Sequence, residues 1–215
     1  MKVLQLAFSL SNRAGGVFEI QLGLSLALRN LGVEVAALGL EDDLSRQDAS
    51  RWGGISAKCL PVSGPRFFGY AKNFYKTLDE MKPNLCHLHT LWMYPSIAMK
   101  NWSRIQKKPY VVTPNGMLEP WALANSGWKK RLAGFFYEKA MLQGAACLQA
   151  NTQKEANDFR AYGLKNRIEI VPNGVDLPEL RISDCALRNN KKRLLFLGAM
   201  EKVGAGGFIS SGIKR

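Results

Sequence analysis

Residues 109–121 read PYVVTPNGMLEPW, and this segment indicates most clearly what kind of fold the chain adopts. Its β-branched run 111–113 (VVT) predicts a buried strand, which ends abruptly at Pro114, Asn115 and Gly116. Asparagine tolerates unusual backbone angles, and glycine has no side chain that would block a ligand. Open α/β sheets bind their ligands at turns of this kind, at the carboxyl ends of the strands.

The same arrangement of strand and polar turn occurs twice earlier in the chain. Residues 3–9 (VLQLAFS) lead into 11–16 (SNRAGG), and residues 85–90 (LCHLHT) lead into 91–95 (LWMYP). If the three strands belong to one parallel sheet, their ends line a single crevice, which we take as the expected functional centre.

The hydrophobic pattern of the chain predicts alternating strands and helices. Strands are expected at residues 3–9, 33–38, 57–62, 85–89, 110–113, 145–150 and 168–171, and helices at 17–31, 67–81, 95–105, 128–142 and 152–162. This order indicates an α/β fold, a Rossmann-like doubly wound and mostly parallel sheet flanked by helices. We expect one complete domain at residues 1–172, a linker at 173–192 and the start of an incomplete second domain at 193–215.

Composition and charge exclude several classes of protein. The 215 residues are 47% hydrophobic and 22% charged, as in ordinary globular proteins, and no apolar run is long enough to span a membrane. The four cysteines are widely spaced without a zinc-binding pattern, which favours a reducing, cytoplasmic location. The net charge of +13 is explained by solubility, by a membrane surface or by a nucleotide-phosphate partner, and no nucleic-acid-binding motif accompanies it.

Two strand-end segments contain candidate binding residues. Gly15 and Gly16 precede a helix, where main-chain N–H groups attract phosphate, although an ordinary tight turn explains the pair equally well. His87 and His89 alternate along their strand, so both lie on one face of the sheet. We interpret His87 as a buried structural residue and His89 as a candidate for substrate contact, with Trp92 as a stacking surface. No acidic or cysteine ligands accompany them, so no metal site is expected.

Two later segments have alternative explanations. Residues 152–155 (TQKE) form a capping-box pattern, so Glu155 either caps a helix or contacts substrate. The predicted helix 128–142 combines Lys129, Lys130 and Arg131 with two phenylalanines. Such a helix either lies on an anionic membrane or, as we favour, packs on the core with a charged outer edge.

Together these motifs resemble the N-terminal domain of family 4 of the retaining glycosyltransferases, which have the two-domain GT-B architecture. The matching pieces, in chain order, are Gly15 and Gly16 with Glu19, 87–92 (HLHTLW), 113–118 (TPNGML), 120–123 (PWAL), 150–152 (ANT) with Glu155, 172–176 (PNGVD) and 196–198 (FLG). The ordered series spans roughly residues 1–198 and is far more specific than any one motif.

The resemblance implies transfer of a sugar from a nucleotide-sugar donor to a glycan or lipid-linked acceptor, with no metal or other cofactor. It implies catalytic positions at His89 and Asn115. It also implies substrate-binding positions at Gly15, Gly16, Glu19, Trp92, Gly116, Glu155, Asn173 and Gly174. Acceptors of this kind belong to polysaccharide and cell-envelope synthesis, which implies a cytoplasmic chain that is either free or peripheral at the inner face of the membrane.

The family's arginine after the FLG motif is absent here, where residues 199–204 read AMEKVG. We therefore expect a truncated transferase that has the acceptor side, lacks most of the donor side and is inactive alone. The alternative is a non-catalytic sugar- or anion-binding module, or a partner of a separate donor-binding chain. A dinucleotide-dependent oxidoreductase is disfavoured because the glycine fingerprint is missing.

Overall fold

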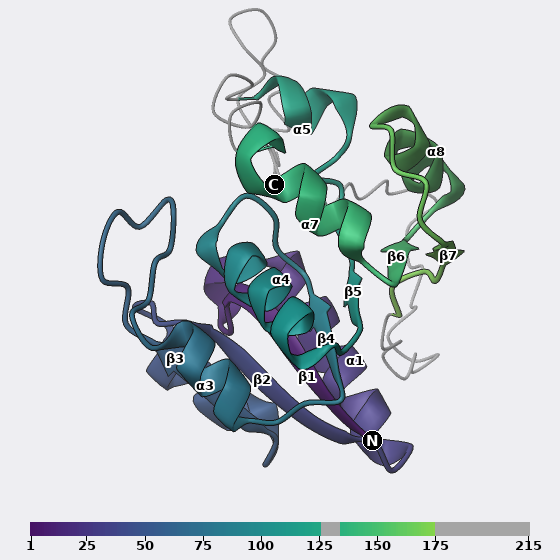
Figure 1. Cartoon of the computed structure of the whole chain (residues 1–215). Helices are drawn as coiled ribbons and strands as arrows, with labels where there is room; N and C mark the ends of the chain where they lie inside the picture. The colour runs from purple at the N-terminus through teal and green to yellow at the C-terminus, as the bar shows by residue number, and fades with distance from the viewer. Residues whose placement is uncertain (126–133, 175–215) are drawn as a thin grey trace, which may run out of the picture. The chain divides into compact units, whose positions relative to one another are not determined.

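A computed structural model of the chain describes residues 1–125 and 134–174, which form an α/β unit around one parallel sheet (Figure 1). The strands are β1 (Lys2–Ser9), β2 (Glu34–Leu40), β3 (Ser56–Leu60), β4 (Leu85–Leu88), β5 (Tyr110–Val112), β6 (Cys147–Ala150) and β7 (Ile168–Ile170). Their order is β3-β2-β1-β4-β5-β6-β7, and every neighbouring pair is parallel. The predicted fold class is therefore confirmed.

The helices of the described residues connect successive strands. They are η1 (Asn12–Ala14), α1 (Gly16–Asn30), α2 (Ser45–Asp48), η2 (Ala49–Trp52), α3 (Phe74–Glu80), α4 (Tyr94–Gln106), α5 (Pro120–Ala124), the π-helical turn η3 (Gly134–Glu138), α7 (Lys139–Gly144) and α8 (Gln153–Ala161). Because β2 and β3 lie on one side of β1 and β4 on the other, the winding direction reverses between β1 and β4. Doubly wound sheets bind ligands at the carboxyl edge of such a reversal.

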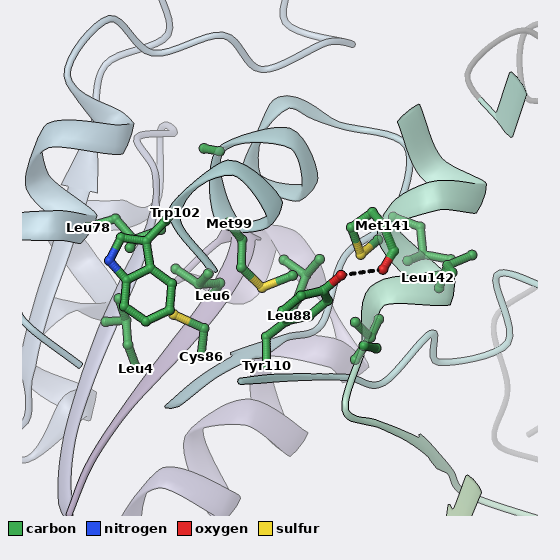
Figure 2. Close-up of a cluster of buried hydrophobic side chains, with 14 of the residues drawn as sticks. Leu4, Leu6, Leu78, Cys86, Leu88, Met99, Trp102, Tyr110, Met141 and Leu142 are labelled. Carbon is green, nitrogen blue, oxygen red and sulfur yellow. Dashed lines mark hydrogen bonds between the residues drawn. The ribbon is translucent and has the colours of Figure 1, made fainter. Parts of the chain in front are cut away.

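Alternation along the strands sends side chains to two separate cores. Leu4 and Leu6 of β1 point to the face covered by α3, α4 and α7, whereas Ala7 packs with Phe18 of α1 and Trp52 of η2 on the opposite face. Figure 2 shows the first core, in which α4 places Met99 and Trp102 against β4. The Tyr110 hydroxyl donates a hydrogen bond of 2.5 Å to the carbonyl of Met141, which fixes β5 to α7.

Two of the predicted helices differ from the observed ones. The helix expected at 67–81 begins only at Phe74, and Phe67, the first residue of the expected helix, is 78% exposed. Residues 63–70 form a loop instead, because Ser63 N–H bonds to the Tyr70 carbonyl and Tyr94 N–H bonds to the Phe68 carbonyl. The helix expected at 128–142 has its first residues outside the described ranges, and the described part divides into η3 and α7.

Gly69 is the residue that lets the 63–70 loop approach the sheet. Its φ of +67° is in the left-handed region, and a Cβ atom there would lie 2.5 Å from Leu40 Cδ1 and 2.8 Å from Met93 Cε. We expect Gly69→Ala to lower the free energy of unfolding by about 2 kcal/mol, from backbone strain and overpacking together. Urea denaturation monitored by fluorescence measures this change.

The control for this variant is Gly64→Ala in the same loop. No heavy atom lies within 4 Å of a Cβ built on Gly64, and its φ is outside the left-handed region. The control is expected to change stability by less than about 0.5 kcal/mol. Equal effects of the two substitutions would contradict the close packing assigned to Gly69.

In the part of the chain that the structure describes, no helix is both long and apolar enough to cross a bilayer. The second and third predicted segments of the domain organisation, 173–192 and 193–215, lie outside the described residues except for Asn173 and Gly174.

Candidate functional site

The three strand ends singled out in the sequence lie next to one another at the carboxyl edge of the sheet. His89 N–H donates to the Leu6 carbonyl at 2.9 Å, and Thr113 N–H donates to the Leu88 carbonyl at 2.9 Å. Phe8 N–H also bonds to Thr90 Oγ1 at 2.9 Å, so the segments after β1 and β4 are tied together. The expected alignment of these strand ends is therefore confirmed.

The turn between β1 and α1 exposes its backbone. Gly15 has a φ of +56°, and Gly15 and Gly16 are both exposed, with no heavy atom within 4 Å of a Cβ built on either. Gly16 is the first residue of the 15-residue helix α1, so N–H groups without helical partners point from this end. The Ser11 side chain accepts from Arg13 N–H, and Asp48 accepts from Asn12 N–H at 2.7 Å, which holds the turn in place. An anion can therefore reach the main chain here.

Asp42, just after β2, joins the ends of β1 and β2. Its carboxylate accepts hydrogen bonds from the Ser9 hydroxyl at 2.5 Å, from the Ser11 hydroxyl at 2.8 Å and from Leu44 N–H at 2.9 Å. Partial burial acts to raise the pKa of Asp42, but the hydrogen bonds outweigh it and lower that pKa below its usual range. Asp42 is consequently ionised, and its hydrogen bonds hold the β1–α1 turn in place.

Glu19 of α1, a predicted substrate-binding residue, is engaged by another side chain. Both of its oxygens accept from the Arg51 guanidinium, at 2.9 and 2.8 Å, and Arg51 also lies 4.8 Å from the centre of the Phe18 ring. This hydrogen-bonded pair raises the pKa of Arg51. In this arrangement Glu19 connects α1 to η2, and its contact with a substrate stays a prediction.

His87 and His89 lie next to each other on the α1 side of the sheet, with ring centres 4.2 Å apart and the ring planes tilted by 37°. His87 Nε2 is 2.7 Å from Thr113 Oγ1, and His89 Nε2 is 2.7 Å from Gln5 Oε1. Burial lowers the pKa of His87 to about 4, and burial together with the neighbouring His87 lowers the pKa of His89. Both rings are therefore neutral near pH 7.

His89 differs from His87 in one respect that bears on its predicted catalytic position. Its side chain is only 1% exposed, and among the described residues its Nδ1 has no hydrogen-bond partner. A neutral imidazole in this state can donate or accept a hydrogen bond, but it carries no charge. Direct contact between His89 and a substrate stays a prediction.

Trp92, the predicted stacking residue, is held by the π-helical turn η3. Its φ is +68°, its carbonyl accepts from the Tyr137 hydroxyl at 2.9 Å, and its main-chain N–H donates to the Glu138 carboxyl. A Cβ on Gly134 would lie 4.0 Å from the Trp92 ring, so η3 also lies against the indole. The side chain is half-buried at the carboxyl edge of the sheet, beyond β4.

Glu138 is a fully buried carboxyl that the sequence interpretation overlooked. Burial raises its pKa to about 8, although hydrogen bonds from Trp92 N–H and the Ser96 hydroxyl act in the opposite direction. Within the described residues, its Oε2 has no partner, which fits a protonated carboxyl. The sequence did contain a signal for this residue. Glu138 precedes Met141 and Leu142 by three and four residues, and this helical spacing places it on the same face as those two core residues.

Asn115, Gly116 and Glu155 are brought together after β5 and β6. One Glu155 oxygen accepts from Gly116 N–H at 2.6 Å and the other from Asn151 N–H at 2.6 Å. Asn115 is in the left-handed region at φ +50°, and its Oδ1 accepts from the Asn151 amide at 3.3 Å. Glu155 therefore fixes the turn that sequence alone had suggested as the ligand-binding one.

The capping-box expectation at residues 152–155 is correct in part. Thr152 caps α8, with its side chain accepting from Glu155 N–H at 3.1 Å. The reciprocal half of the motif is wrong, because the Glu155 carboxylate binds Asn151 and Gly116 rather than Thr152 N–H. Proximity of the β5 turn to the end of β6 accounts for this difference.

Asn173 and Gly174, the last predicted site residues, follow the edge strand β7. Two strands, β5 and β6, separate β7 from β4. These residues are thus not adjacent in the sheet to the Gly15–Gly16 turn.

A pocket of about 340 Å³ opens at the carboxyl ends of β1 and β2, where the 63–70 loop and Met93 complete its wall. Its apolar lining consists of Phe8, Leu40, Val62, Phe67 and Met93. Arg13 and Arg66 also line it, together with Asp42. The sequence interpretation did not select these residues as a group, because they come from separate segments of the chain, around residues 8–13, 40–42, 62–67 and 93, which only the fold brings together.

The sequence profile of the glycosyl transferase 4-like domain matches residues 15–174. Comparison with curated protein sequences gives no match. Among solved structures, the chain is similar to HepE from Anabaena in complex with UDP, with 17% identity, a TM-score of 0.61, and coverage of 82% of this chain and 45% of HepE. It is also similar to sucrose-phosphate synthase from Thermosynechococcus elongatus, with 16% identity, a TM-score of 0.56 and coverage of 82% and 49%.

A putative UDP-N-acetylglucosamine 2-epimerase from Listeria monocytogenes shares the fold too, with 14% identity, a TM-score of 0.53 and coverage of 78% of this chain and 43% of that one. The chain thus spans about half the length of the solved structures that it matches. These structural likenesses concern the fold, whereas the sequence match extends from Gly15, in the first strand-end turn, through the two later turns. That match shows that the chain belongs to the glycosyl transferase 4-like domain family.

Proposed function

We propose that this chain forms the acceptor-side domain of a GT-B type glycosyltransferase, which transfers a sugar from a nucleotide-sugar donor to a glycan or lipid-linked acceptor. The observation that carries the proposal is that the family match at residues 15–174 includes Gly15, Gly16 and the two later turns, and that these strand ends lie side by side at one edge of the sheet. HepE, which shares the fold, is described in complexes with UDP and with UDP-glucose, and this supports a nucleotide-sugar donor.

Each turn has a chemical part in this proposal. The exposed N–H groups at Gly15 and Gly16 hydrogen-bond the donor diphosphate, where the positive end of α1 favours negative charge. Trp92 offers an aromatic face to a sugar ring, and the Asn115 amide hydrogen-bonds sugar hydroxyls. Glu155 acts indirectly by holding Gly116 and Asn151. No metal or other cofactor takes part in the proposed reaction.

His89 and Glu19 have weaker support in this scheme. The neutral His89 ring contributes a hydrogen bond through its unpartnered Nδ1, which requires a local movement because the ring is buried. Glu19 reaches a ligand only by leaving Arg51. Asn173 and Gly174 begin the connection to a donor-side domain.

A lipid-linked acceptor would place the chain in the cytoplasm, peripheral at the inner face of the membrane. The net charge of +13 supports attraction to anionic lipid. Trp121 of α5 is 58% exposed, which supports an interfacial contact. Cys59, Cys86 and Cys147 are free thiols, as expected in a reducing compartment.

The proposal is tested with the 215-residue chain, UDP-glucose, UDP-N-acetylglucosamine and GDP-mannose. We expect at least one nucleotide sugar to shift the backbone amide resonances of Gly15 and Gly16 at millimolar concentration. We expect no measurable release of nucleoside diphosphate in the presence of acceptor glycans, because the turns described here supply few groups to stabilise the leaving diphosphate. Sugar transfer by the chain alone would disprove the proposal that it forms only the acceptor-side domain. Unchanged resonances at all three turns with every donor would disprove the transferase proposal.

A further inference from the structure

We propose that Gln5 is a positioning residue for His89, and that it fixes the imidazole as the tautomer with its proton on Nε2 and a hydrogen-bond acceptor at Nδ1. The tautomer follows from the contact between these two side chains. Its consequence for a ligand rests on the proposed function, and the two are tested separately.

Gln5 is a polar residue in the middle of an apolar strand. Its neighbours Leu4 and Leu6 are in one core of the sheet, whereas Gln5 points to the opposite face, as does His87, its in-register partner on β4. The side chain of Gln5 is 0% exposed. A buried amide costs free energy unless its polar atoms find partners, so an apolar side chain would be the expected occupant of this position. The exception indicates that the amide of Gln5 has a role.

The partner of this amide is the His89 ring, directly after β4. Gln5 Oε1 lies 2.7 Å from His89 Nε2, and the contact is buried. An amide oxygen has lone pairs and no proton, so Nε2 must carry the proton and donate. Since a neutral imidazole has a single N–H, Nδ1 of His89 then carries a lone pair. The reverse orientation of the amide would put the proton on Nδ1, which gives the experiment its alternative outcome.

Among the described residues, Gln5 is the one hydrogen-bond partner of the His89 ring. The adjacent His87 ring, with its centre 4.2 Å away, uses its own Nε2 to contact Thr113 Oγ1 at 2.7 Å. Burial and the neighbouring His87 both lower the pKa of His89, so the ring is neutral and can exist as either tautomer. Gln5 is therefore the residue that selects between them.

The backbone on both sides of the contact is fixed, so its geometry is set before any ligand binds. Gln5 is paired in register with Ala37 of β2 as well as with His87 of β4. His89 N–H donates to the carbonyl of Leu6, the residue after Gln5, at 2.9 Å. The two side chains thus extend from adjacent positions of a rigid central sheet, which is the support that a preorganised site residue needs.

The tautomer determines which ligand groups the ring can bind. With a lone pair at Nδ1, His89 accepts a hydrogen bond from a hydroxyl or an amide N–H, and it cannot donate one to a phosphate oxygen. In the proposed transferase, on which this consequence rests, the donor diphosphate is therefore left to the turn at Gly15 and Gly16.

The test uses the 215-residue chain with ¹⁵N-labelled histidine and a purification tag that contains no histidine. His87 and His89 are the two histidines of the sequence, so long-range ¹H–¹⁵N spectra contain two rings, and His87→Gln assigns them. These spectra distinguish a protonated ring nitrogen from one with a lone pair. Near pH 7 we expect His89 to be at least about 90% in the Nε2–H form, since a buried hydrogen bond favours that tautomer about tenfold. A predominant Nδ1–H form would overturn the proposal.

Variants of Gln5 test its role as the positioning residue. Gln5→Met removes the acceptor with little change of volume. We expect the ratio of Nε2–H to Nδ1–H forms to fall at least about threefold, because a buried Nε2–H would then have no partner. Gln5→Glu keeps an acceptor at the same place and should keep the proton on Nε2. The matched control is Gln21→Met on α1, since Gln21 is also 0% exposed and no described residue hydrogen-bonds its amide.

The control should leave the spectra of both histidines unchanged. Equal ratios in the parent chain and Gln5→Met, or equal effects of Gln5→Met and Gln21→Met, would overturn the assignment of Gln5. If the Gln5 variants fail to fold, the spectrum of the parent chain still decides which tautomer is present. An Nε2–H form without any response of the strand-end turns to nucleotide sugars would overturn the transferase proposal and leave this inference standing. An Nδ1–H form together with such a response would overturn this inference alone.

Discussion

Glu155→Ala is expected to lower the free energy of unfolding by about 3–5 kcal/mol, the largest effect of any single substitution considered for this chain. The carboxylate accepts two short backbone hydrogen bonds, from Gly116 and Asn151, while 6% of the residue is exposed. Hydrogen bonds to a charged group contribute about 1.5–3 kcal/mol each, and the variant leaves both N–H donors without their acceptor. Urea denaturation measures the change.

The control for Glu155→Ala is Glu34→Ala, whose ion pair with Lys2 is solvent-exposed. We expect a loss below about 1 kcal/mol for this control. Glu155→Gln should be intermediate, because its amide oxygen can accept one of the two N–H groups and its NH₂ group cannot accept the other. Faster hydrogen exchange at Gly116 and Asn151 should accompany both Glu155 variants. If Glu155→Ala lowers the free energy of unfolding by less than about 1 kcal/mol, the turn at Asn115 and Gly116 does not depend on the Glu155 carboxylate.

The second large effect is a pH dependence of stability that comes from Glu138. Burial raises the pKa of this carboxyl to about 8 in the folded state, whereas in the unfolded chain it ionises near pH 4.3. Between these values the folded state binds the proton and the unfolded state does not. The contribution of Glu138 to stability is therefore fully present below about pH 4 and decreases as the pH rises to about 8.

Comparison with Glu138→Gln isolates this contribution from that of the other titratable groups. Glutamine retains an oxygen that can accept from Trp92 N–H and does not ionise. At about 1.4 kcal/mol for each pKa unit, the parent chain should lose about 3–5 kcal/mol relative to the variant between pH 4.5 and pH 8. Urea denaturation at several pH values gives both curves.

The control for the pH experiment is Glu34→Gln, an exposed carboxyl that should leave the curve parallel to that of the parent chain. If the stability curve of Glu138→Gln is also parallel to that of the parent chain, the prediction is wrong and the buried carboxyl is ionised in the folded state. Because Glu138 holds Trp92 N–H, its ionisation is also expected to change Trp92 fluorescence in the same pH range.

The order of the elements could be predicted from the sequence because it depends on local periodicity. Apolar residues at helical spacing in 17–31 gave α1, and the β-branched run before Asn115 gave β5. The helix expected at 67–81 failed at its start because long-range hydrogen bonds from Tyr94 and the close approach at Gly69 hold that segment as a loop. Such contacts leave no signal in the periodicity of the segment itself.

The candidate site divides in the same way. A strand followed by a polar, glycine-containing turn was visible three times, and it correctly indicated which strand ends would meet. The roles of individual side chains were less accessible. Glu155 looked like half of a helix cap, and only the fold shows that its partner is Gly116, 39 residues away. Asp42 and Glu138 were not selected at all, because their importance depends on which backbone N–H groups lie beside them.

By itself, then, the sequence determined the layered α/β fold, the positions of the three turns and the membership of a glycosyltransferase family. Hydrophobic pattern and turn chemistry are local properties, and they suffice for those conclusions. Only the tertiary structure decided that Arg13 and Arg66 share a pocket, that Glu19 is paired with Arg51 and that His89 is buried. Those outcomes depend on distances between residues far apart in the chain, which are set when the sheet and its covering helices pack together.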